Sequence, residues 1–129
     1  MESTVMYRRL SEAIESLKEA EIINDAGVSN LATLTKLYHA MIYSLMALFE
    51  IEDIGSLTHA DLIERFEKEY IQKGTFRTDL LDALRFAYNF THECDCAHMK
   101  EPEDKDIEYL MPLAEKLVRM VRNSLSETK

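Results

Sequence analysis

Arg85, Asn89 and His92 are spaced so that one helix would carry all three on one face. Seven positions fall about 20° short of two helical turns, which places Arg85 and His92 on one stripe with Cα atoms about 10.5 Å apart along the axis. A guanidinium binds phosphate oxygens through its planar fork, and an imidazole exchanges protons near neutral pH. The stripe predicts metal-independent phosphodiester cleavage, with His92 as general acid or base, Arg85 stabilising phosphate charge and Asn89 orienting the phosphate or the histidine. The alternative is that polar residues share this face without a function.

A second group of reactive side chains overlaps this stripe, with potential metal ligands at every second residue: His92, Cys94, Cys96 and His98. On a helix, alternate members of this run point to roughly opposite faces, so the four converge only if the segment unwinds. Structural zinc sites use two pairs of ligands at wider spacings. The chain also lacks the Glu-x-x-His pairs of di-iron bundles and any Gly-rich phosphate loop. We therefore expect no metal site and no cofactor.

The composition is typical of one soluble helical domain spanning residues 1–129. Hydrophobic residues make up 47% and charged residues 30%, with only three Gly and two Pro. The net charge of −9 opposes nonspecific nucleic-acid binding, and we expect no DNA partner. The two cysteines are poorly placed to bridge, the N-terminus lacks the apolar segment of a signal peptide, and the longest apolar run, residues 40–49, is too short to span a bilayer. These features predict a cytoplasmic protein without a membrane anchor.

Apolar periodicity predicts five helices over roughly residues 3–24, 29–49, 58–74, from 78 or 79 through 92, and 103–126. Gly27 is expected to end the first helix in a left-handed conformation. The second is apolar nearly all round, which predicts a central position. Thr58 and Asp61 form a candidate capping box for the third. His39 is interpreted as an interior or interface residue, and His59 as a helix-start residue that bonds the neighbouring loop.

The order and spacing of several residues resemble the HEPN family (higher eukaryotes and prokaryotes nucleotide-binding domain), and in particular its small stand-alone prokaryotic members. The similarity is strongest between residues 31 and 92, and the flanking helices agree in number and length. The matching positions are Tyr38, Ala40, Met41, Ala47, Leu48, Thr58-His59, Leu62-Ile63, Phe66, Gly74 and Leu84-Arg85.

This resemblance implies an all-α, five-helix, mostly antiparallel bundle with a four-helix up-and-down core that forms a homodimer. In active members an Arg-x4–6-His motif forms a ribonuclease site between two subunits, and Arg85 and His92 match its longest spacing. It further implies a toxin-type ribonuclease acting on RNA beside a minimal nucleotidyltransferase partner, as in toxin-antitoxin pairs. The chain departs from the family pattern at two places. It has Asn89-Phe90 where many members have Asp-Tyr, and Cys94 where some toxin members carry an AMP-accepting Tyr. The alternatives are a non-catalytic nucleotide- or partner-binding module and a helical scaffold protein.

Overall fold

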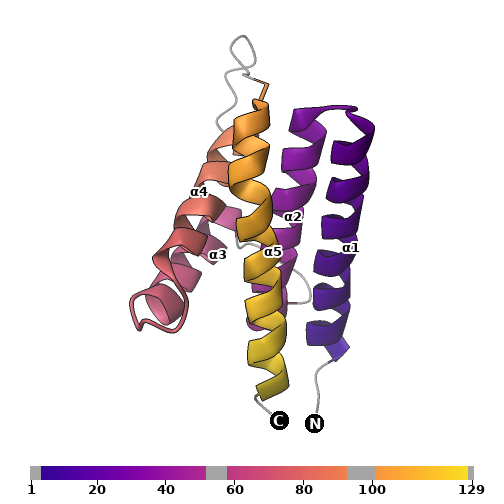
Figure 1. Cartoon of the computed structure of the whole chain (residues 1–129). Helices are drawn as coiled ribbons and strands as arrows, with labels where there is room; N and C mark the ends of the chain where they lie inside the picture. The colour runs from indigo at the N-terminus through magenta and orange to yellow at the C-terminus, as the bar shows by residue number, and fades with distance from the viewer. Residues whose placement is uncertain (1–3, 52–57, 93–100, 128–129) are drawn as a thin grey trace.

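The chain folds into a bundle of antiparallel helices. The computed structural model describes residues 4–51, 58–92 and 101–127, and within these residues it contains no strand. The elements are α1 (Thr4–Ala26), α2 (Asn30–Leu48), α3 (His59–Phe66), the π-helical segment η1 (Glu67–Ile71), α4 (Thr78–His92) and α5 (Asp104–Glu127). The four long helices alternate in direction, and α3 with η1 lies beside α4 (Figure 1). The predicted all-α, five-helix bundle with an up-and-down core is confirmed.

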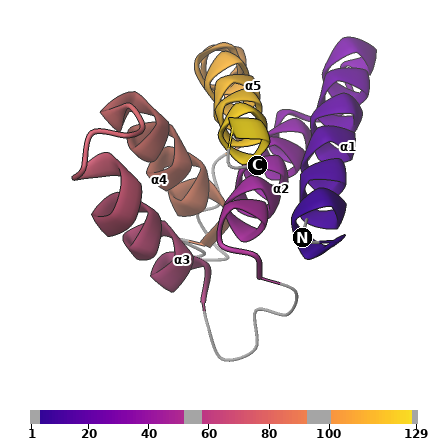
Figure 2. The same cartoon turned by 90° about the horizontal axis from the view of Figure 1, so that it is seen from below.

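Helix α2 occupies the centre of the bundle. It packs against α1, α3, α4 and α5, and Figure 2 shows it among the other helices when the bundle is seen from below. Its side chains are buried around most of its circumference, including Leu34, Leu37, Met41 and Leu45. A helix that is apolar around its whole circumference is stable in water only when neighbouring helices cover every face. The central position predicted from the sequence is therefore confirmed. No helix in the described ranges has the length and apolar character needed to cross a bilayer.

The helix boundaries follow from local capping chemistry. Gly27 adopts φ +66°, a left-handed conformation that costs glycine little, and it ends α1 as predicted. The Ser29 side chain caps α2 by accepting a hydrogen bond from the backbone N–H of Ala32 at 3.2 Å. Thr58 and Asp61 form the predicted capping box at α3, with reciprocal hydrogen bonds of 3.0 and 3.1 Å.

The start of α2 is also held by residues that precede and begin α5. The Glu101 carboxylate accepts hydrogen bonds from the Ser29 hydroxyl at 3.2 Å and from the backbone N–H of Leu31 at 3.1 Å. The side-chain amide of Asn30 donates to the Asp104 carboxylate at 2.9 Å. Since helix N-termini carry unsatisfied N–H groups and favour nearby negative charge, these contacts fix α5 against α2.

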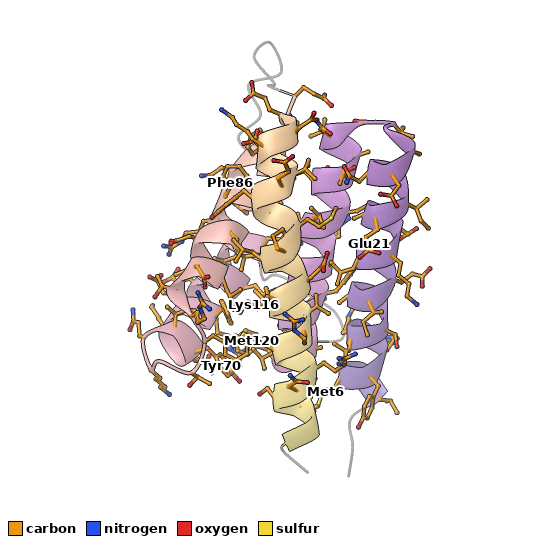
Figure 3. The ribbon with its side chains drawn as sticks, viewed as in Figure 1. Met6, Glu21, Tyr70, Phe86, Lys116 and Met120 are labelled. Atoms are coloured by element: carbon orange, nitrogen blue, oxygen red, sulfur yellow. The ribbon has the colours of Figure 1, made fainter. Side chains whose placement is uncertain are left out.

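The third predicted helix changes its winding halfway along. It is α-helical up to Phe66 and π-helical from Glu67, where the backbone N–H of Gln72 bonds the Glu67 carbonyl at 2.9 Å. The wider turn accompanies a cluster of aromatic rings in which Phe66 stacks on Tyr70 at 6.0 Å and both meet Phe76 at 5.4 Å. Tyr70 is labelled low in the bundle in Figure 3. The sequence predicted one uniform helix to Gly74, so the π-helical turn is new.

Candidate functional site

Helix α4 presents Arg85 and Asn89 outward. Its opposite face is buried, because Leu80, Leu84 and Ala87 have no exposed surface. Arg85 and Asn89 are both exposed, one helical turn apart. His92 is the last residue of α4, although its side chain lies outside the described part of the structure. The backbone thus places the three predicted residues on one helix, with the first two facing away from the core.

A pocket lies where α3 and η1 meet α4. Its volume is about 440 Å³, and its polar lining comes from Glu64, Glu67, Lys68, Arg85, Tyr88 and Asn89. Two of the three residues predicted from the sequence therefore share one concave surface. The wall formed by Glu64, Glu67 and Lys68 was not predicted from the sequence, because these residues have the spacing of an ordinary solvent-exposed helix face. Only the packing of α3 against α4 turns that face toward Arg85.

Both cations of this pocket are paired with carboxylates. Arg85 Nη2 lies 2.6 Å from Glu67 Oε1, and Lys68 Nζ lies 2.9 Å from Glu64 Oε1. The hydrogen bond and charge of Glu64 raise the pKa of Lys68. The pocket lining consequently carries two positive and two negative groups and no net charge.

A hydrogen-bonded aromatic cluster supports the pocket from behind. The Tyr38 hydroxyl on α2 lies 2.8 Å from Nδ1 of His59 at the start of α3. The Tyr38 ring also meets the rings of Tyr88 on α4 and His39 on α2, with centroids 6.4 and 6.1 Å apart. Three helices are joined in this way directly behind the Tyr88 wall. The sequence predicted that His59 starts a helix and bonds the neighbouring loop, and it did not predict the bond to Tyr38 on α2.

Replacing Tyr38 with Phe is expected to lower the free energy of unfolding by about 1 kcal/mol at neutral pH, because the partly buried His59 nitrogen loses its hydroxyl partner. Burial, and then the charge of Tyr88, raise the pKa of Tyr38. The native state therefore keeps a phenol proton that the unfolded chain releases above pH ~10. The advantage of wild type should be complete below that pH and shrink above it, as measured by urea denaturation. An advantage that grows with alkalinity would contradict this assignment.

Two other features are less suited to phosphate chemistry. A wider pocket of about 750 Å³ lies between the end of α1, the start of α2 and α5, but its charged lining residues are all acidic: Asp104, Glu108 and Glu115. In the run of potential metal ligands, Cys94, Cys96 and His98 lie outside the described residues, as does the His92 side chain. Among the side chains that are described, no three His, Cys, Asp or Glu gather at a potential metal site.

Comparisons with known proteins give one family match and one curated relative. A family model described as "HEPN domain" matches residues 6–124. A Methanocaldococcus jannaschii protein named "Putative toxin MJ0142" is 24% identical over 106 residues, which cover 82% of this chain and 71% of that protein. No solved structure gives a significant match. The resemblance inferred from the sequence is thereby confirmed at the level of the family.

Proposed function

The chain belongs to the HEPN domain family, and from this premise we propose that it is a toxin-type ribonuclease subunit that works as a homodimer beside a nucleotidyltransferase partner. The similarity to a protein named as a toxin supports the biological class. The observation that carries the chemical proposal is the exposed placement of Arg85 and Asn89 in one pocket wall, on the helix that ends at His92.

In the proposed reaction, Arg85 binds the scissile phosphate through its planar fork and Asn89 orients it. His92 removes the proton from the neighbouring ribose 2′-hydroxyl, and the 2′-oxygen attacks phosphorus. The bond from phosphorus to the 5′-oxygen breaks, and that oxygen accepts a proton from the imidazolium of the second copy of His92. The products are a 2′,3′-cyclic phosphate and a 5′-hydroxyl.

The surroundings of α4 support the homodimer. Phe86 and Phe90 directly follow Arg85 and Asn89 in sequence and are only half-buried. Figure 3 labels Phe86 on the upper part of α4, where its ring lies 5.1 Å from that of Tyr109, which is 42% exposed. Partly exposed rings beside a polar stripe are a common composition for a protein interface. A second copy seated on this surface would bring its own stripe close to the first.

The proposal predicts RNA cleavage in the presence of excess chelator, because two imidazoles and a guanidinium supply the proton transfers and the charge stabilisation. Single-stranded RNA is incubated with the purified protein in EDTA, alongside DNA and 2′-O-methyl RNA of the same sequence. Only the RNA should be cut, with a cyclic phosphate at the new 3′ end. Cleavage of the 2′-O-methyl strand, or no cleavage of RNA, would contradict the proposal.

A non-catalytic binding module is the second candidate, and the internal pairing of the pocket charges favours it. Glu67 and Glu64 neutralise Arg85 and Lys68, so the pocket offers little net attraction to a polyanion. Such a pocket suits a polar surface of a partner protein or a single nucleotide. Saturable nucleotide or partner binding without cleavage of any RNA would support this function over the ribonuclease.

A further inference from the structure

The carboxylate of Glu67 occupies a position that a phosphate would need in order to bind Arg85. Its Oε1 accepts a hydrogen bond from Arg85 Nη2 at 2.6 Å, within the same pocket that holds Asn89. Carboxylates and phosphates use the same N–H donors of the guanidinium fork. An anion that enters the pocket must therefore displace Glu67 or share Arg85 with it.

The backbone holds both partners of this pair in place. Glu67 directly follows Phe66, the fully buried last residue of α3, and Arg85 directly follows Leu84, which is also fully buried. Two buried anchors thus set the separation of the two helices at this point. The side chains themselves remain accessible, at 50% exposed for Arg85 and 29% for Glu67. An ion pair this exposed is weak, so an incoming anion can displace it.

From this geometry we infer that Glu67 competes with phosphate for Arg85 and thereby sets the affinity of the pocket for anions. The inference rests on the proposed function in one respect, the assignment of Arg85 as the phosphate ligand. Inorganic phosphate binds weakly, because it has to displace the Glu67 carboxylate from Arg85. A longer RNA strand gains contacts elsewhere along the stripe that offset the displacement of Glu67. Because every anion must break the same ion pair, Glu67 lowers the affinity of the pocket for phosphate in general. Only a strand held at several points then binds tightly.

The test follows the Arg85 Nε–Hε resonance by NMR while inorganic phosphate is added to the full-length protein. The variant Glu67→Gln should reach half-saturation at about fivefold lower phosphate than wild type, the upper end of what an exposed ion pair contributes. Glu64→Gln is the matched control, since it removes a carboxylate from the same pocket with the same change in net charge but frees Lys68. It should shift the Arg85 titration much less.

Equal gains in the two variants would overturn the inference, because the effect would then be general electrostatics. In an Arg85→Gln background, phosphate binding is followed through the backbone amides of α4. If Glu67→Gln still raises the phosphate affinity in that background, the inference is overturned as well. An Arg85 resonance that never responds to phosphate in either protein would also overturn it. RNA cleavage is scored separately. A fivefold gain without any cleavage supports the competition and rejects the ribonuclease, whereas cleavage with unchanged phosphate affinity does the reverse.

Discussion

Replacing His92 with alanine is expected to lower the rate of RNA cleavage by about 10²- to 10⁴-fold, the usual contribution of a positioned general acid or base. Arg85 and Asn89 remain on the exposed face of α4, so the variant should still bind RNA. His92 is the last residue of α4, where alanine is compatible with the helix. Initial cleavage rates measure the loss, and binding of 2′-O-methyl RNA together with circular dichroism verifies that recognition and fold persist.

The matched control is His98→Ala, which removes another imidazole from the same His- and Cys-containing run but has no role in the proposed reaction. It should cleave RNA at the wild-type rate. Equal rates for wild type and His92→Ala would exclude His92 as the proton-transfer group. Equal losses in both histidine variants would instead indicate that the run acts as a unit, as a metal site does.

Replacing Phe66 with alanine is expected to lower the free energy of unfolding by about 3–5 kcal/mol. Phe66 is fully buried, and its ring contacts those of Tyr70 and Phe76 at the point where α3 passes into η1. The deletion leaves a cavity that the surrounding rings cannot fill without distorting the π-helical turn. A domain of this size is stable by only about 5–15 kcal/mol, so the loss should be large in a urea denaturation curve.

A suitable comparison for this variant is Phe86→Ala, which removes the same side chain from the half-buried contact between α4 and α5. Measured at concentrations where the protein is monomeric, its loss of stability should be clearly smaller, because solvent then reaches part of that ring. If Phe86→Ala lowers the free energy of unfolding as much as Phe66→Ala does, then Phe66 and the rings around it do not hold η1 in place more firmly than an ordinary surface contact would. The ion pair of Glu67, the next residue, would then lack its fixed support.

Most of the fold follows from signals within a few residues of each other. Thr58 and Asp61 form the capping box that their spacing predicts, and Gly27 adopts the expected left-handed conformation. The apolar sequence of α2 predicts a central position, and α2 does lie at the centre of the bundle. In each case the controlling interaction is either a hydrogen bond within one helical turn or the burial of one continuous segment, both of which are encoded locally.

The π-helical turn and the partner of Arg85 were not predictable in this way. Glu67 and Arg85 are separated by 18 positions, and Tyr38 and His59 by 21. Whether such side chains meet depends on how two helices cross, which is decided by the whole core. The switch to π-helical winding at Glu67 leaves no distinctive local pattern, because the rings it accommodates have ordinary helical spacing.

The candidate site was predictable in part. The spacing of Arg85 and Asn89 predicts that they share a face, and the packing of α4 decides that this face is exposed and borders a pocket. The stripe gave no indication that an acidic residue from another helix would neutralise the guanidinium. Sequence spacing describes one helix at a time, whereas the charge state of a pocket depends on every wall.

The contacts between Glu101 and the start of α2 have a consequence for synthesis on the ribosome. Glu101 reaches Ser29 and Leu31 across about 70 positions, and α5 packs against a face of α2. A nascent chain that has just produced His92 holds every proposed catalytic group, yet its central helix still lacks its last neighbour. We expect the bundle to fold stably only after α5 has left the exit tunnel, so that products truncated before α5 remain unfolded and inactive.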